Sequence, residues 1–168
     1  DFTLTGGTDG SLTKSDYING YDAFANKEEV QIDFLIAPVG GQNDIPLLHA
    51  KLVEIATGRK DCVAVISPER ADVVNNNSYS GKERTDIISY RDSLPSSSYA
   101  VMDSGWKYMY DKYNDTFRYV PLNGDTAGLM VQTDLTRDPW YSPAGFNRGI
   151  LKNVIKNYYN PDKADRDI

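Results

Sequence analysis

The fold depends first on the run CVAVIS at residues 62–67, which Pro68 ends. Its apolar residues are nearly continuous, as expected for a strand that is covered on both faces of a sheet. A similar run, QIDFLIA, occupies residues 31–37, and the short segment YAVM occupies residues 99–102. We therefore expect three strands, the first two of them buried.

Helical patterns separate these strands. A helix is expected from the cap at Asp44 to Gly58, and a second one from about Lys82 to Leu94, before Pro95. Residues 1–10 predict a short strand and a glycine-rich turn. A further helix is then expected, capped by Ser15, with apolar residues at spacings of three and four: Tyr17, Ile18, Tyr21, Phe24 and Ala25. The order strand, helix, strand, helix, strand predicts a three-layer α/β domain with a parallel sheet, right-handed crossovers and helices on its faces.

The pattern changes after Asp103. Trp106, Tyr108 and Tyr110 alternate with polar or flexible residues, and a second alternating segment follows a turn at residues 111–115. This predicts a β-hairpin with one aromatic face. A helix is expected from Pro121 to about Thr133, then an irregular segment at 137–145 and a short apolar patch at 150–155. We predict two units, an α/β core with the hairpin at 1–120 and the start of a small α+β C-terminal domain at 121–168.

Composition excludes several classes of partner. The 168 residues carry a net charge of −6 without a run of Lys or Arg, which disfavours direct nucleic-acid binding. The longest apolar run, residues 62–66, is far below the roughly 20 residues of a membrane span, so no membrane insertion is expected. The single cysteine, Cys62, excludes an internal disulfide and is expected to be a buried apolar residue. The chain starts without Met and stops inside a charged stretch, so we expect it to be part of a longer protein.

Catalytic equipment is sparse. The only imidazole, His49, lies in mid-helix beside an apolar stripe, and no Gly-x-Ser-x-Gly elbow is present. Ligands of open α/β sheets bind beyond the carboxyl ends of the strands, here at residues 39–44, 67–70 and 103–105. The first of these loops lacks the Gly-x-Gly-x-x-Gly spacing and the Walker lysine. We predict no catalytic residue and no cofactor.

Metal sites are not expected either. The turn at residues 111–115 offers oxygen ligands but lacks the glycine and glutamate of a calcium loop. One Cys and one His cannot supply a structural zinc site.

Several segments together resemble a known family. They are LTGGTDG at 4–10, DCVAVISP at 61–68, YAVMD at 99–103, YMYDKYND at 108–115, VPL at 120–122, TAGL at 126–129 and PWYSPAGFNRG at 139–149. Their succession resembles the C-terminal half of the contractile tail sheath protein of myovirus-type bacteriophages. The WYSPAG stretch is the most specific part of the resemblance.

The resemblance implies a structural subunit and not an enzyme. Copies would assemble in a helical lattice around the tail tube and contract to drive the tube through the host envelope. Other implied partners are the baseplate and tail terminator proteins, and the implied location is the virion tail, assembled in the host cytoplasm. The implied core has a subtilisin-like shape, but His49 is misplaced for a triad. The family joins neighbours through terminal arms that this chain lacks, so we expect it to be monomeric or weakly associating alone.

Two questions stay open at the level of sequence. Arg137, Asp138, Trp140 and Tyr141 are candidate subunit-interface residues, because an aromatic irregular loop is costly to expose; alternatively, Trp140 packs into the small C-terminal domain. An α/β hydrolase or nucleotide-binding enzyme is the alternative function, and it predicts a polar pocket with shifted pKa values near Gly40, Ser67 and Asp103. A carbohydrate-binding module would instead require Trp106, Tyr108 and Tyr110 to be exposed together.

Overall fold

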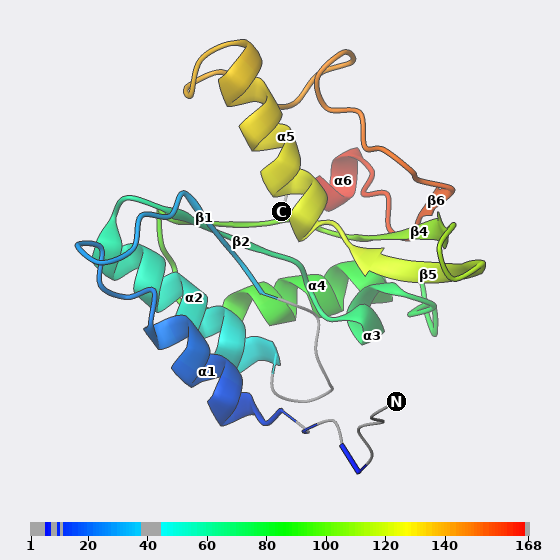
Figure 1. Ribbon diagram of the computed structural model, residues 1–168. Coiled ribbons are helices and arrows are strands. Elements are labelled where there is room, and N and C mark those ends of the chain that lie inside the picture. The colour runs from blue at the N-terminus through cyan, green and yellow to red at the C-terminus, as the bar shows by residue number, and fades with distance from the viewer. Residues whose placement is uncertain (1–5, 8–9, 11, 38–44, 167–168) are drawn as a thin grey trace, which may run out of the picture.

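A computed structural model describes residues 6, 7, 10, 12–37 and 45–166. The expected opening strand, the helix cap at Asp44 and the glycine-containing loop at 39–44 lie outside the described residues. The described part is a mixed α and β structure with two three-stranded sheets, one parallel and one antiparallel (Figure 1).

The parallel sheet confirms the three predicted strands. Of the two that were expected to be buried, the second is (residues 63–66), whereas the first has Ile36 37% exposed. It consists of β1 (Phe34–Ile36), β2 (Val63–Ile66) and β3 (Ala100–Met102), in the order β1-β2-β3. Leu35 pairs with Ala64 and Val65 with Val101, so both pairings are parallel. The crossovers contain α2 (Ile45–Arg59) and, after β2, α4 (Lys82–Asp92). The expected strand-helix order therefore gives the expected parallel connection, while the short helix α3 (Arg70–Val73) was not anticipated.

The largest core cluster lies between α2 and the parallel sheet. Leu52 and Ala56 of α2 are fully buried against Leu35 and Ala64. The side chains of Tyr17, Ile18, Tyr21 and Phe24, on α1 (Lys14–Asp22) and just after it, cover this cluster from outside, as the spacing predicted. Ser15 is not the cap of α1. Thr13 is, because its Oγ1 accepts the Asp16 N–H while Asp16 accepts the Thr13 N–H, which satisfies both donors at once.

The C-terminus of α2 differs from the prediction. Gly58 does not end the helix, which continues to Arg59; Lys60 then adopts the left-handed conformation at φ 63°. The extra residue places the Arg59 guanidinium in the interior. There it donates to the carbonyl oxygens of Phe24 (2.6 Å) and Val30 (2.8 Å) and pairs with Asp61. These bonds tie the segment between α1 and β1 to the core, and they explain why the turn comes at Lys60.

The antiparallel sheet contains the expected hairpin and one further strand. Its order is β5-β4-β6, with β4 (Trp106–Asp111), β5 (Thr116–Pro121) and β6 (Lys156–Asn157). Rings from the two hairpin strands contact one another, as in Tyr108 with Tyr119 at 4.9 Å between centroids. The hairpin prediction is confirmed, whereas β6 was not predicted.

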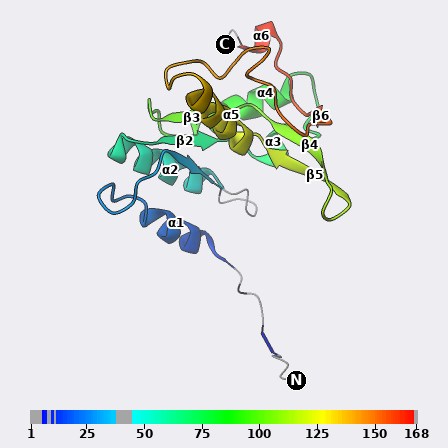
Figure 2. The same cartoon turned by 45° about the horizontal axis from the view of Figure 1, so that its top comes forward.

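Helix α5 (Asn123–Thr136) leaves the hairpin and crosses to the parallel sheet. Pro121 does not start it, because Pro121 still pairs with Trp106 in the hairpin. The first turn of α5 meets the carboxyl ends of β1 and β2, on the side opposite to α2 and α4, and the rest of the helix stands away from the sheet (Figures 1 and 2). Residues 137–155 then run without helix or strand to β6, followed by the short helix α6 (Lys163–Arg166).

Candidate assembly surface

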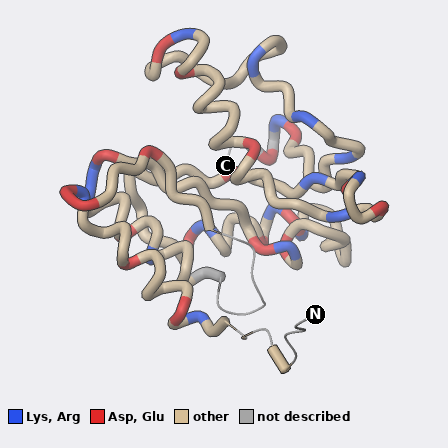
Figure 3. The backbone as a smooth tube through the Cα atoms, in the orientation of Figure 1, with Lys and Arg blue, Asp and Glu red and all other residues tan. Residues whose placement is uncertain are grey.

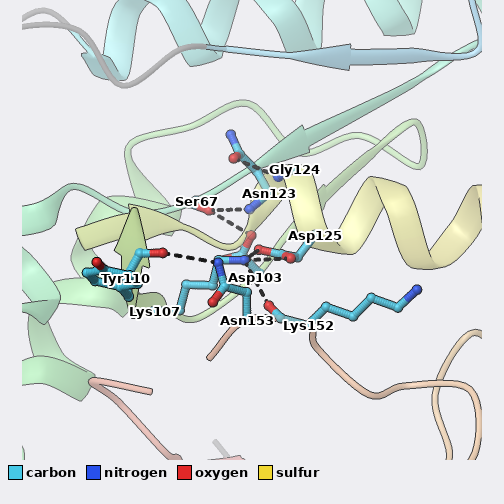
Figure 4. A network of polar contacts seen from close by, with 9 residues as sticks. All are labelled: Ser67, Asp103, Lys107, Tyr110, Asn123, Gly124, Asp125, Lys152 and Asn153. Atoms are coloured by element: carbon cyan, nitrogen blue, oxygen red, sulfur yellow. Dashed lines mark hydrogen bonds and ion pairs between the residues drawn. The ribbon is translucent and has the colours of Figure 1, made fainter. Parts of the chain in front are cut away.

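A polar network occupies the carboxyl ends of the parallel strands (Figure 4). The Ser67 hydroxyl donates to Asp103 Oδ2 at 2.7 Å and accepts the backbone N–H of Asn123 at 2.9 Å. Asp103 Oδ1 accepts the Gly105 N–H at 3.0 Å, and the Asn123 amide donates to the carbonyl oxygen of Ala37 at 3.2 Å. The network therefore joins the ends of β1, β2 and β3 to the start of α5.

The electrostatics of this network are unusual. Burial raises the pKa of the Asp103 carboxyl to about 7, against the hydrogen bonds from Ser67 and Gly105, which lower it. The nearby Asp125 carboxylate also raises the pKa of Asp103. Asp125 itself pairs at 2.8 Å with the buried Lys107 ammonium, which also donates to the carbonyl oxygen of Lys152 at 3.2 Å. A second polar contact thus fixes α5 against β4 and the segment before β6.

The alternative function, an α/β hydrolase or nucleotide-binding enzyme, predicted shifted pKa values near Gly40, Ser67 and Asp103, and only Asp103 has one here. The shifted Asp103 lies beside Ser67, as that hypothesis required, and Gly40 lies outside the described residues. However, Ser67 is only 2% exposed, and its hydroxyl is already engaged as donor and acceptor within the fold. His49 belongs to a different cluster, so it cannot serve as a base for Ser67. The geometry is that of a structural junction. Across the described residues, no group of three or more His, Cys, Asp or Glu is placed to hold a metal ion.

His49 is a residue of α2, and its side chain Nδ1 forms a hydrogen bond with the hydroxyl of Tyr90 on α4. The imidazole is buried, and its Nε2 has no hydrogen-bond partner. Burial lowers the pKa of His49 to about 4, since the charged imidazolium would lose its hydration there. The interpretation of His49 as a packed helix residue is therefore favoured over a general base.

We expect the imidazole ring of His49 to titrate near pH 4 in a proton NMR titration, instead of near 6.5. The chain holds a single histidine, so the ring signals need no assignment. A depressed pKa means that His49 contributes stability above pH 6.5, about 3 kcal/mol, which is lost as the pH falls to 4. A midpoint near 6.5 would show that the ring is open to solvent and contradict its burial.

Trp106 does not belong to the exposed part of the hairpin, although Tyr110 and Phe117 are exposed. Trp106 is only 3% exposed and packs among Val73, Val74 and Ile87, while its indole N–H donates to the Pro68 carbonyl at 2.9 Å. The carbohydrate-binding hypothesis needed Trp106 to be exposed with Tyr108 and Tyr110, so it is wrong.

Three exposed aromatic side chains lie in residues 137–149, here called the aromatic loop. Trp140 is 81% exposed and Phe146 is 99% exposed, and Tyr141 is exposed as well. Trp140 therefore does not pack into a small C-terminal domain within the described residues. Arg137 and Asp138 are exposed too, and their backbone groups only end α5 and begin the loop. Phe146, the most exposed aromatic residue of the loop, was absent from the predicted interface residues, although it belongs to the same sequence motif.

Arg148 holds the aromatic loop in shape. Its Nε donates to the carbonyl oxygen of Ser142 at 3.0 Å, and its Nη2 donates to that of Ala144 at 2.8 Å. The same guanidinium stacks 4.8 Å from the centroid of the Tyr141 ring. The planar fork of arginine makes these three contacts together, which a lysine could not do.

Two glycines of the motif allow this tight path. Gly145 has a φ of 134°, a conformation that residues with a side chain rarely adopt. A Cβ on Gly149 would lie 3.2 Å from the backbone N and O of Gly145, whose carbonyl accepts the Gly149 N–H at 2.8 Å. The PAGFNRG part of the sequence thus encodes a closed loop that carries Phe146 at its outer side.

Replacing Arg148 by alanine should loosen the aromatic loop without unfolding the protein. We expect amide hydrogen exchange in residues 140–149 to accelerate at least about tenfold, because two carbonyl contacts and one ring contact are lost. The free energy of unfolding should fall by no more than about 1 kcal/mol, since the loop is exposed. The matched control is Arg137→Ala, which removes an exposed arginine of the same loop. Equal exchange in both variants would contradict the role of Arg148.

Further exposed apolar side chains flank the loop in sequence. Leu135 at the end of α5, Ile150, and Ile155 before β6 are all exposed. Large apolar surfaces on a soluble protein commonly mark contacts with a partner. Together with Trp140 and Phe146 they form the candidate assembly surface.

Comparison with known proteins gives this surface a context. Over 98% of its length, the chain is 38% identical to the tail sheath protein of Enterobacteria phage T4. Over 99% of its length, it is 33% identical to the tail sheath protein of Vibrio phage KVP40. The chain is a homologue of phage tail sheath proteins. The tail sheath protein of Salmonella phage ViI is a third match. It is 39% identical over 70% of this tail sheath homologue, and the matched part makes up 18% of that relative.

The tail sheath homologue spans only about a quarter of its relatives, 27% of both the T4 and the KVP40 protein. No family model matches it. Within its described residues, none of the helices has the length and apolar character that crossing a bilayer requires. The expected resemblance to sheath proteins is confirmed.

Proposed function

We propose that the chain is part of a structural subunit of a contractile phage tail sheath. Copies of the full-length subunit assemble helically around the tail tube and contract to drive the tube through the host envelope. The observation that carries the proposal is the similarity to three tail sheath proteins, which in two of them extends over almost the entire chain. The exposed aromatic loop supports it, because a subunit of a lattice needs surface that a neighbour covers.

The same proposal extends to partners and location. The tail tube, the baseplate and the tail terminator are the partners of such a subunit, which assembles in the host cytoplasm and resides in the virion tail. Arg137, Asp138, Trp140 and Tyr141 belong to its contact surface, and we add Phe146 to them.

The proposal also covers the finer domain description. Residues 1–120 form a three-layer core of subtilisin-like shape without a triad, and residues 121–168 begin a smaller C-terminal domain. The irregular course of residues 137–155, outside the parallel sheet, supports this division, while Asn123 and β6 attach the second part to the first.

The decisive test is negative-stain electron microscopy of the full-length protein expressed alone. Hollow tubes of regular diameter are expected. Compact dispersed particles well above micromolar concentration would contradict the sheath proposal. Tubes of the full-length protein would also show that these 168 residues are part of a subunit that assembles, and not an isolated domain.

A further inference from the structure

Two cations lie over a pair of tyrosine rings on the antiparallel sheet. The Arg70 guanidinium is 4.5 Å from the centroid of the Tyr119 ring. The Lys156 ammonium is 4.5 Å from that of the Tyr158 ring. The two rings meet edge to face at 5.1 Å, and their hydroxyls are 3.1 Å apart. We call these four residues the cation–tyrosine site. Contact with an aromatic face orients a cation and leaves its N–H groups able to donate to an anion.

The charge of this site is not neutralised by its surroundings. In the part of the chain that the structure describes, no carboxylate forms an ion pair with Arg70 or Lys156. Glu69 is the sequence neighbour of Arg70, but its charge acts toward Tyr90 on α4. The charged groups that act on the Tyr119 hydroxyl are the two cations. A protein of net charge −6 thus carries a locally positive site.

A pocket of about 680 Å³ opens beside Arg70. Its lining comes from the end of β1, the start of α3, the hairpin and the first residue of α5, and among these described residues only Arg70 is charged. The other polar donors are already used within the fold. The Trp106 indole donates to Pro68, and the Asn123 amide donates to Ala37. An occupant therefore meets apolar and aromatic walls and one guanidinium, which favours a carboxylate.

The turn at residues 26–30, before β1, offers carboxylates of the required kind. Glu28 and Glu29 are both exposed, and neither forms an ion pair with any residue that the structure describes. Lys27, the cation of this turn, acts on the carboxylate of Asp61. Two carboxylates are thus available to a partner. We call residues 26–30 the acidic turn.

The acidic turn has a fixed shape. The carbonyl oxygen of Asn26 accepts the N–H groups of Glu29 and Val30, both at 3.3 Å. The Arg59 guanidinium, buried at the end of α2, donates to the carbonyl oxygen of Val30 at 2.8 Å. A turn that is ordered before binding loses little conformational freedom when it binds.

The acidic turn and the cation–tyrosine site lie at opposite ends of the parallel sheet. The turn precedes the amino end of β1, whereas Ile36 and Ala37 at its carboxyl end line the pocket. Figures 1 and 2 both place the segment before β1 far from β4 and β5, and Figure 3 shows Asp and Glu at the outer end of that segment. One copy therefore cannot fill its own site with its own turn. Two different, complementary surfaces on one chain give a head-to-tail contact, and repetition of such a contact generates an open helix when the rotation does not close a ring.

We propose that the acidic turn of one copy docks at the cation–tyrosine site of the next copy. Glu28 and Glu29 supply the carboxylates. Arg70 binds one of them in its pocket, and Lys156 binds the other. This rests on the proposed function, because it names a contact through which sheath subunits associate. A pair of exposed charges contributes little to stability by itself, but the same contact recurs at every subunit of a lattice.

Charge reversal in the full-length protein tests the pairing. One variant carries Arg70→Glu and Lys156→Glu, and the other carries Glu28→Lys and Glu29→Lys. Each variant alone brings like charges together, so it should need at least about tenfold more protein than the wild type to form tubes. An equal mixture restores opposite charges at every contact in alternating order, and it should assemble within about threefold of the wild-type concentration. Arg91→Glu, at an exposed position of α4, is the control and should assemble like the wild type.

Cysteine crosslinking locates the contact without changing its charges. One variant carries Gln31→Cys, beside the acidic turn, and the other carries Asn157→Cys, beside Lys156; both positions are exposed. The native Cys62 is buried and does not compete for a short bismaleimide reagent. Co-assembled variants should give a crosslinked peptide that joins residues 31 and 157 of different copies. Because proximity raises the effective concentration of the thiols, the yield should be at least about tenfold above that of Gln31→Cys with Gln132→Cys, an exposed position of α5.

The outcomes separate this contact from the proposed function. Wild-type tubes, together with reversed variants that assemble as readily as the wild type, would overturn the contact and leave the sheath proposal standing. Variants that fail alone and also fail in the mixture would overturn it too, since their defect would not be one of pairing. A thiol at residue 157 that crosslinks only to other segments would have the same meaning. Dispersed wild-type protein without the crosslink would contradict both proposals.

Discussion

Replacing Trp106 by alanine should lower the free energy of unfolding by about 4 kcal/mol. The indole fills the space between β4, α3 and α4, in contact with Val73, Val74 and Ile87. Its removal leaves a cavity and also leaves the Pro68 carbonyl without its donor. Urea denaturation followed by far-ultraviolet circular dichroism measures the loss.

Two variants bracket this expectation. Tyr110→Ala is the matched control, because Tyr110 is a hairpin aromatic residue at an exposed position, and it should cost no more than about 1 kcal/mol. Trp106→Phe keeps most of the buried ring but not the N–H, and it should lie between the two. If Trp106→Ala were as stable as Tyr110→Ala, the hairpin would not be anchored through this ring.

Replacing Asp103 by asparagine should stabilise the protein at pH 8 and change little at pH 4. The pKa of Asp103 is raised to about 7, so the folded state keeps a proton that the unfolded state releases near 3.8. Stability from this group is therefore fully present below pH 3.8 and is lost as the pH rises through 7, by up to about 4 kcal/mol. Asparagine preserves a neutral group beside Ser67, so we expect a gain of about 3 kcal/mol at pH 8.

The pH profile of this variant carries a second signature. As the pH rises from 4 to 6.5 in the wild-type protein, the contribution of His49 to the free energy of unfolding increases and that of Asp103 decreases. The two contributions therefore oppose each other. Removing the carboxylate should leave the His49 contribution visible as a rise in stability over that window. Asp92→Asn, at an exposed position of α4, is the matched control. An unchanged profile in Asp103→Asn would show that the carboxyl is hydrated and ionised throughout.

The parts of the fold that could be predicted from sequence are those with a strong local signal. The three apolar runs became β1, β2 and β3, and the central strand β2 is the one that is buried along most of its length, as a continuous apolar run predicts. The hairpin followed from alternation around an Asn/Asp turn, where Asp115 takes a positive φ of 47°. In both cases the information lies within a dozen neighbouring residues.

Other features depend on residues that are distant in sequence. β6 contains only Lys156 and Asn157, and it exists because β4 offers a free edge to it. The α2 end at Lys60 is set by Arg59 reaching carbonyl groups about 30 residues earlier in the chain. Neither has a local pattern that could have indicated it.

The candidate surface was partly predictable. WYSPAG drew attention to Trp140 and Tyr141, but the position of Phe146 depends on how Arg148 closes the loop. Asp103 and Ser67 could be named as strand-end residues, whereas their engagement by Asn123 depends on where α5 starts. The conformation of a loop that is fixed by side-chain contacts has no periodic sequence pattern, so it could not be predicted from the sequence.

The two tryptophans of this chain sit in opposite surroundings, one enclosed in the core and one in water. Their fluorescence should therefore divide into two components, a blue-shifted emission that a dissolved quencher cannot reach and a red-shifted one that it suppresses. The first follows unfolding and the second follows the covering of the aromatic loop, so a single unlabelled sample can report on folding and on association separately. The variants Trp106→Phe and Trp140→Phe would isolate each component.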